Sequence, residues 1–209
     1  MHDTHRGSRP ADLASERDRL LTVATATFAE YGWRDSTVDA VCHRADITSA
    51  DFYTLYATVD DLFAEMYARE AAARVTAVRD AMRPVTDGLA DEAPDATIAR
   101  VASALAAATS DRDWWILTTE YMLRAVRHPD VATTYRALRR QTHRAMAEAI
   151  GEALEQAGLA GSVDVDQFVE IISSLHRGAV AQNFLEPDAT SPQVLDHHAW
   201  TAVLRATAT

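Results

Sequence analysis

Apolar residues recur at intervals of three and four along almost the whole chain, which is the spacing that one face of an α-helix requires. The first clear stripe runs through Leu20, Leu21, Ala24, Phe28 and Tyr31. No stretch alternates apolar and polar residues for long enough to indicate a β-sheet. The pattern therefore predicts an all-α protein.

Capping and helix-breaking residues divide the first part of this pattern into separate helices. After a polar segment, residues 1–13, which we expect to be mobile, the first helix is predicted to begin near Ser15 and to end at Gly32. Two very short helices are predicted over 37–44 and 48–55, because each segment opens on a threonine that can accept a backbone hydrogen bond.

The remaining helices are longer. Thr58 and Asp61 form a capping pair at the start of a long helix that we expect to end at Pro84. Further helices are predicted from about 97, from about 111, over 129–156, over 164–185 and over 192–204. The chain is therefore expected to contain about nine helices.

Composition narrows the class of protein. Nearly half of the 209 residues are apolar, which is enough for a sizeable core, and Cys42 is the only cysteine, so neither an intrachain disulfide nor a cysteine-based metal site can form. We expect no metal and no cofactor. No apolar run is long enough to cross a membrane, and residues 1–12 lack the apolar segment of a signal peptide, so we expect a cytoplasmic protein without a membrane partner.

A long helix, two short helices and another long helix over 14–66 have the order of a helix-turn-helix DNA-binding domain. The residues of this segment resemble the signature of the tetracycline-repressor (TetR) family of transcription regulators. The matching elements are Phe28-Ala29-Glu30-Tyr31-Gly32-Trp33, Ser36-Thr37-Val38, Val41, Ala45-Asp46-Ile47-Thr48, Phe52-Tyr53-Thr54-Leu55-Tyr56 and Asp60-Asp61-Leu62. The resemblance implies a DNA-binding domain over 14–66, a ligand-sensing and dimerisation domain over 67–209, and a homodimer.

The same resemblance implies that the helix opening at Thr48 lies in the major groove of an operator. Asp51 on this helix either accepts a hydrogen bond from a cytosine amino group or serves only as the capping partner of Thr48. The residues expected to contact DNA are Arg34, Thr37, Arg44, Thr48, Ser49, Asp51, Tyr53, Thr54 and Thr58.

This surface departs from the family pattern. Ala50 stands where the family usually has glycine, Val59 where it has lysine, and Leu55 where it has histidine or an aromatic residue. Residues 1–66 hold six arginines against twelve acidic residues, whereas proteins gain most of their affinity for a duplex from cations. Either the acidic side chains lie away from the groove, or the domain has lost its DNA affinity and the protein acts as a ligand- or protein-binding module.

Polar and aromatic residues within the apolar C-terminal helices are the candidate ligand contacts, and we expect a small apolar or aromatic ligand. Glu120 and Arg124 are four residues apart, so they form either a surface ion pair or a charged contact in the pocket. His176 is either a hydrogen-bonded core or interface residue or a ligand contact. The full set is Trp114, Trp115, Glu120, Tyr121, Arg124, His143 and His176.

The last two predicted helices carry apolar stripes that need a partner surface, and a two-fold dimer is the usual one. The residues expected at this interface are Phe168, Ile172, Leu175, Gln182, Asn183, Trp200 and Leu204. The chain lacks the motifs of nucleophilic, phosphate-binding or zinc-dependent catalysis. We therefore expect a repressor that a ligand releases from its operator, and not an enzyme.

Overall fold

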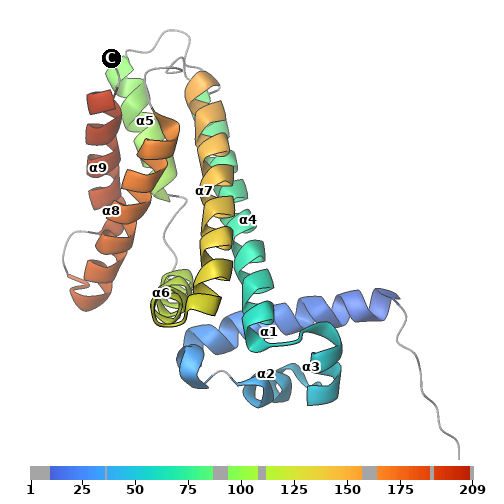
Figure 1. Ribbon diagram of the computed structural model, residues 1–209. Coiled ribbons are helices and arrows are strands. Elements are labelled where there is room, and N and C mark those ends of the chain that lie inside the picture. The colour runs from blue at the N-terminus through green and yellow to red at the C-terminus, as the bar shows by residue number, and fades with distance from the viewer. Residues whose placement is uncertain are drawn as a thin grey trace, which may run out of the picture. The chain divides into compact units, whose positions relative to one another are not determined.

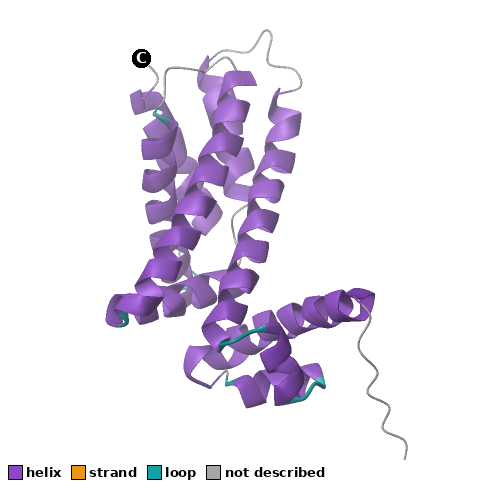
Figure 2. Cartoon of the chain, turned by 45° about the vertical axis from the view of Figure 1, so that its right-hand side comes forward, coloured by secondary structure: helices purple, strands orange, loops and turns teal. Residues whose placement is uncertain are grey.

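The chain is all-helical wherever the structure describes it, as predicted (Figures 1 and 2). The computed structural model describes residues 10–35, 37–86, 94–107, 112–156, 164–188 and 191–207, and these contain nine helices and no strand. The helices are α1 (Pro10–Asp35), α2 (Val38–Ala45), α3 (Ser49–Leu55), α4 (Val59–Thr86), α5 (Pro94–Ala107), α6 (Arg112–Arg127), α7 (Pro129–Gln156), α8 (Val165–Leu185) and α9 (Pro192–Thr207).

These helices pack as two compact units. Unit 1 consists of Met1–Tyr67 and Ile116–Tyr135, and unit 2 consists of Ala68–Trp115 and Arg136–Thr209. Unit 1 thus takes in 116–135 in addition to the helix-turn-helix segment, although the expected division had placed these residues in the C-terminal domain. Helices α4, α6 and α7 contribute residues to both units.

Threonine side chains begin the short helices of unit 1. The hydroxyl of Thr37 accepts a hydrogen bond from the backbone N–H three residues on. Thr48 and Asp51 form a complete capping box at the start of α3, and the hydroxyl of Thr58 accepts from the backbone N–H of Asp61 at 3.1 Å. Each bond satisfies a donor that the first turn of a helix leaves unpaired, which fixes where these helices begin.

Three predicted boundaries were wrong or incomplete. Helix α1 begins at Pro10, so Ser15 lies inside it; proline suits the first turn because its missing N–H would be unpaired there. Gly32 breaks the helical geometry with φ 71° and ψ 179°, but the helix resumes beyond it. Helix α4 continues past Pro84 to Thr86.

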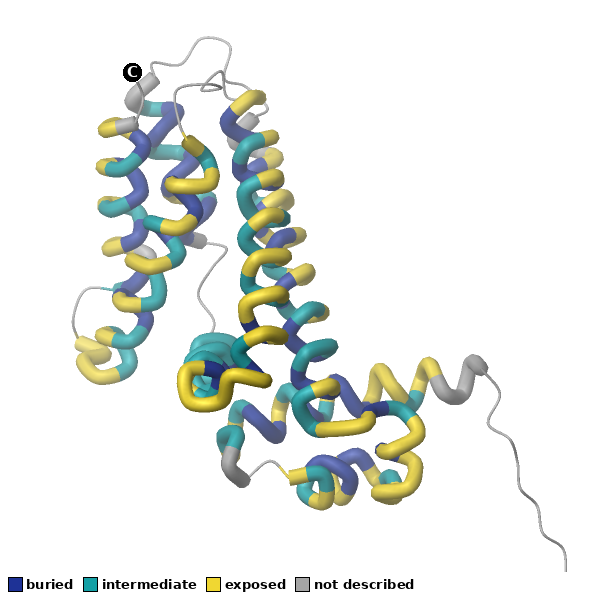
Figure 3. Tube along the Cα trace, viewed as in Figure 1, coloured by how far each residue is buried: buried dark blue, intermediate teal, exposed yellow. Residues whose placement is uncertain are grey.

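The core of unit 1 holds α2 and α3 against α1 and α4. Phe28, Val41, Phe52 and Leu62 are buried in this core, whereas Val38 and Ile47 are half-buried. Figure 3 shows buried positions recurring along one side of the long helices, as an amphipathic pattern requires.

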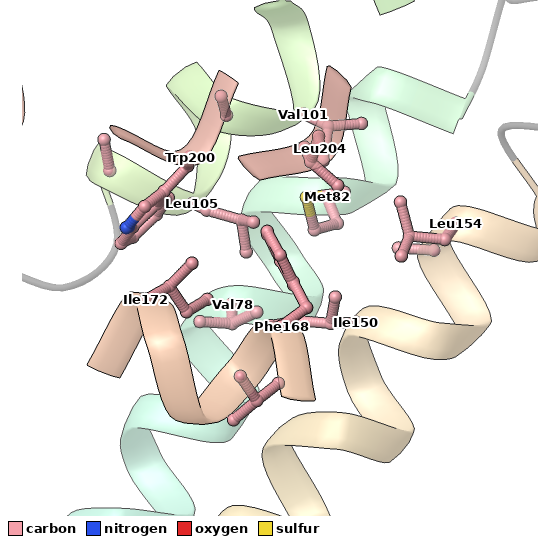
Figure 4. Packing of buried hydrophobic residues seen from close by; sticks show 14 of the residues in the cluster. Val78, Met82, Val101, Leu105, Ile150, Leu154, Phe168, Ile172, Trp200 and Leu204 are labelled. Atoms are coloured by element: carbon pink, nitrogen blue, oxygen red, sulfur yellow. The ribbon is translucent and has the colours of Figure 1, made fainter. Parts of the chain in front are cut away.

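Unit 2 has a core of its own, drawn from α4, α5, α7, α8 and α9 (Figure 4). In Figure 4, Trp200 of α9 lies beside Leu105 of α5 and Leu204 of α9 lies beside Val101 of α5, while Phe168 of α8 lies between Val78 and Ile150. No helix in the described residues is both long and apolar enough to cross a membrane.

Candidate functional site

Helix α3 presents polar side chains outward from a single buried anchor. Phe52 is fully buried, while Thr48, Ser49, Tyr53 and Thr54 are exposed. The ring of Tyr53 is 59% exposed and packs edge-on against Phe52, with 5.4 Å between ring centroids. The buried ring of Phe52 holds the helix in place, and the opposite face of the helix is exposed to solvent.

Local hydrogen bonds hold most hydroxyl groups of this face. Thr48 Oγ1 donates to Asp51 Oδ2 at 2.6 Å, and Thr54 Oγ1 donates to the carbonyl oxygen of Asp51 at 2.6 Å. Ser49 Oγ donates to Asp39 Oδ1 at 3.3 Å. The hydroxyl and backbone N–H of Thr48 hold the pKa of Asp51 below its ordinary value, so this carboxylate is charged and serves as a cap.

Two arginines of unit 1, Arg44 and Arg17, are paired with acidic side chains. Arg44 Nη1 lies 2.6 Å from Glu30 Oε2, and its guanidinium lies over the ring of Tyr31 at 5.5 Å. Arg17 pairs with Glu65 in the same way. Both partners of the Arg44–Glu30 pair are exposed to solvent, which weakens such a pair. Thr37 and Thr58 are exposed at the ends of α2 and α4, and the side chain of Arg34 lies outside the described residues.

Glu120 and Arg124 of α6 each bind another helix of unit 1 and not each other. The carboxylate of Glu120 accepts a hydrogen bond from the backbone N–H of Trp33, immediately after the break at Gly32. The positive φ of Gly32 favours glycine, and a β-carbon built there would lie 2.7 Å from Glu120 Oε1, so the carboxylate would have to shift. The ion pair expected between these two residues is therefore not formed, and neither residue lines the apolar cavity of unit 2 described below.

Arg124 binds Asp60 at the start of α4 through two hydrogen bonds, of 3.2 and 2.9 Å. Its guanidinium lies 4.9 Å from the ring centre of Trp33. Tyr121 stacks on Phe63 with 3.9 Å between centroids, and burial raises its pKa, with the Asp60 carboxylate adding to the rise. These three residues of α6 therefore fasten α1 and α4 within unit 1; they were expected to contact a ligand.

Unit 2 contains an apolar cavity of about 150 Å³. Its walls come from five helices, and most of its lining is aliphatic or aromatic. The apolar lining residues are Val78 of α4, Leu105 of α5, Met146 and Ile150 of α7, Ile172 of α8 and Trp200 of α9, several of which are labelled in Figure 4.

The polar groups of this cavity gather mainly on α8. Ser173, His176 and Arg177 line it from that helix, and Arg74 lines it from α4. His176 Nδ1 lies 2.6 Å from Oδ2 of Asp196, a carboxylate that is only 1% exposed. Because Asp196 occupies Nδ1, Nε2 is the ring nitrogen left for another partner.

His176 is the one predicted ligand contact that lines the cavity. Trp114 lies under the guanidinium of Arg74 at 4.3 Å, and Trp115 donates its indole N–H to the carbonyl oxygen of Arg177. His143 lies in a different, arginine-rich groove, 3.7 Å from Asp166. The other lining residues were missed because an aliphatic side chain on a helix gives no sign of whether it faces a cavity or fills a core.

Four residues expected at a dimer interface are buried within unit 2 itself. Phe168, Ile172, Trp200 and Leu204 belong to its core, so they have no surface to offer a partner. Leu175 is 44% exposed, and Gln182 and Asn183 also retain exposed surface. Further exposed apolar residues of α8 and α9 are Leu185, Val194 and Leu195.

The described residues include no group of three or more histidine, cysteine or acidic side chains that could hold a metal ion. Cys42, which is buried, is a free thiol, and burial raises its pKa.

Comparison with known structures relates this architecture to transcription regulators. A TetR-family regulator from Mesorhizobium loti has a TM-score of 0.69 at 14% identity, over 93% of this chain and 96% of that chain. GusR from Salmonella enterica has a TM-score of 0.66 at 15% identity, over 96% and 100%. A transcriptional regulator from Saccharomonospora viridis, solved in complex with choline, has a TM-score of 0.58 at 17% identity, over 89% and 94%. At these identities the likeness establishes the fold.

Sequence comparison adds the family. No curated protein matches the chain. Residues 101–207, just over half of the chain, match the family model of the C-terminal part of BetI-type transcriptional repressors. The chain therefore belongs to the TetR family of transcriptional regulators and carries a C-terminal domain of the BetI type.

Proposed function

We propose that this protein is a homodimeric repressor that binds an operator through α3 and leaves it when a small ligand with an apolar body enters the cavity of unit 2. The observation that carries the proposal is the cavity itself, an apolar space with a few polar groups on one side, which is the usual form of a small-molecule site. Ligand and operator then oppose each other's binding by the same factor.

The exposed face of α3 supports the DNA-binding part of the proposal. Thr48, Ser49, Tyr53 and Thr54 are the residues that we place against base edges and the nearby backbone. Thr37, Thr58 and Arg44 are placed at phosphates, and Arg44 exchanges Glu30 for a phosphate oxygen on binding. The second candidate function is a TetR-like protein that does not bind DNA, and the pairing of Arg17 and Arg44 with acids is the observation that favours it.

A salt titration of DNA binding separates these two candidates. Purified full-length protein is titrated onto DNA from around its own gene, at several salt concentrations. The proposal predicts binding that weakens steeply as salt rises, because cations at phosphates release counterions. Absence of binding at low salt would leave the second candidate.

Matched threonine variants test the placement of α3. Thr54→Ala removes a hydroxyl from the exposed face of α3, and Thr22→Ala removes one from α1; each hydroxyl donates to a carbonyl of its own helix. We expect Thr54→Ala to change the preferred sequence or to weaken operator binding about tenfold, and Thr22→Ala to leave it unchanged. Tyr53→Ala and Thr37→Ala should weaken binding to all sequences. Equal affinities for all four variants would remove α3 from the interface.

The exposed apolar residues of α8 and α9 support the dimer. Leu175 and Leu185 lie on the same helix as Gly178, and a β-carbon at Gly178 would meet no atom within 4 Å. A second copy packed on this face would cover the leucines, and the glycine would allow its helix to approach closely.

Substitution of this face by arginine tests the dimer. Gly178→Arg and Leu175→Arg should give monomers in light scattering, since the new side chain has room in a single chain but not against a partner. Val126→Arg is the control, because Val126 is also apolar and 79% exposed but belongs to unit 1. Dimers in all three variants would place the interface elsewhere.

The choline bound by the Saccharomonospora viridis regulator makes a small quaternary amine one candidate ligand for this chain.

A further inference from the structure

The cavity of unit 2 has an apolar side and a polar side, and the polar side includes two arginines. Ser173, His176 and Arg177 lie within two turns of α8, where residues three and four apart share one face of the helix. None of the lining residues is acidic. The buried carboxylate of Asp196 is hydrogen-bonded to His176 Nδ1.

The two arginines of the lining differ in their surroundings. Arg74 is held by Glu70, with Nη1 3.2 Å from Oε2, and lies over Trp114. The guanidinium of Arg177 has no acidic partner among the residues that the structure describes; its backbone carbonyl, by contrast, binds Trp115. A guanidinium matches the two oxygens of a carboxylate in geometry and charge.

A second donor lacks an acceptor at the same cavity. Trp200 is 1% exposed and lines the cavity, and its buried indole N–H has no hydrogen-bond partner within the described part of the chain. Buried donors are normally paired, and an unpaired one favours a ligand that brings an oxygen. Both observations point to a ligand that supplies acceptors and negative charge.

The size of the cavity limits the apolar part of the ligand. An apolar cavity of about 150 Å³ holds one benzene ring. A quaternary ammonium ion fits the lining poorly, because such ions are bound by several aromatic rings, whereas Trp200 is the one aromatic residue in the lining.

We propose that the ligand of this cavity is a small monocarboxylate with an apolar body about the size of one benzene ring, whose carboxylate binds Arg177 and its neighbours Ser173 and His176 on α8. This proposal deepens the proposed function, since it names the class of ligand, and it rests on the cavity being the ligand site.

Calorimetric titration of the full-length protein with three matched probes tests the charge. The probes are benzoate, its neutral counterpart benzamide, and choline. We expect benzoate to bind at least about tenfold more tightly than benzamide, and choline not to compete with it. Tighter binding of benzamide or choline than of benzoate, or no binding of benzoate, would overturn the proposal.

Two arginine variants test the position of the carboxylate. Arg177→Met should weaken benzoate binding about tenfold to a hundredfold and leave benzamide unchanged, so that the two probes bind alike. Arg140→Met is the control, because Arg140 lies on α7 in the arginine-rich groove outside the cavity. Ser173→Ala provides a second, smaller change on the same face of α8, expected to weaken benzoate alone. Weaker benzoate binding by Arg140→Met would contradict the placement of the carboxylate at Arg177. Unchanged benzoate binding by both Arg177→Met and Ser173→Ala would contradict it as well.

The same probes separate this proposal from the proposed function. Tight benzoate binding that leaves DNA affinity unchanged would confirm the ligand class and refute ligand-controlled repression. Release of DNA by choline but not by benzoate would confirm ligand control and refute the ligand class.

Discussion

Replacing Gly32 by alanine should destabilise unit 1 through two separate effects. The backbone at Gly32, with φ 71° and ψ 179°, lies in a region that is essentially restricted to glycine, and forcing another residue into it costs about 1–3 kcal/mol. The new β-carbon would also lie 2.7 and 2.9 Å from the carboxylate oxygens of Glu120, which must move and give up the N–H of Trp33. We expect a total loss of about 2–4 kcal/mol in the free energy of unfolding.

A double-mutant cycle separates these effects. In a Glu120→Ala background the collision is absent, so Gly32→Ala should cost only the backbone part, and the two substitutions should show a coupling of about 1 kcal/mol or more. Urea denaturation followed by circular dichroism measures all four chains. Gly151→Ala is the control, because its β-carbon would lie 3.9 Å from Val165, an ordinary contact, in a helix that alanine favours.

Either of two results would refute this reasoning. A Gly32→Ala chain as stable as Gly151→Ala would mean that the break in α1 does not need glycine. Additive costs in the cycle would mean that Glu120 does not lie against Gly32 in solution.

Three further predictions concern single side chains. A hydrogen bond from Arg17 holds the pKa of Glu65 below its ordinary value, so the carboxylate stabilises the fold above about pH 4.3, and this stabilisation is lost as the pH falls through the lowered pKa. Glu65→Gln should therefore be less stable than the natural chain at neutral pH and approach it in acid, as urea denaturation across that range would reveal. Arg124→Met should lower the free energy of unfolding by about 1–2 kcal/mol, because it removes the ion pair with Asp60. Arg127→Met, at an exposed neighbouring position, should lower it by less than about 0.5 kcal/mol. Equal losses in the two variants would contradict a stabilising role of the Arg124–Asp60 pair. Cys42 should react with iodoacetamide only in denaturant, because it is buried and its pKa is raised; rapid labelling of the folded chain would contradict this.

Local signals in the sequence located the helices of this chain well. The hydroxyl caps at Thr37, Thr48 and Thr58 act over three residues, so their pattern is complete within the sequence. Ser15 misled for the same reason: it has the side chain of a cap, but Pro10 begins the helix earlier.

Contacts between residues that are far apart in the sequence could not be predicted from such local signals. Glu120 and Arg124 have the spacing of an ion pair on one helix, yet their partners are 87 and 64 residues away, at Trp33 and Asp60. An apolar stripe likewise indicates that a face is buried but not against which surface. For this reason Trp200 was predicted to lie at the dimer interface, whereas it packs in the core of unit 2 and lines the cavity.

The tryptophans of this chain give each unit its own optical reporter. Of the four indoles, Trp33 belongs to unit 1, where it stacks on Phe28 beneath the guanidinium of Arg124, and the other three belong to unit 2. Trp200 forms part of the cavity wall, so a molecule entering there alters the surroundings of its ring directly. Emission from chains that retain only Trp33 or only Trp200 would distinguish events in unit 1 from events at the cavity, without any attached dye.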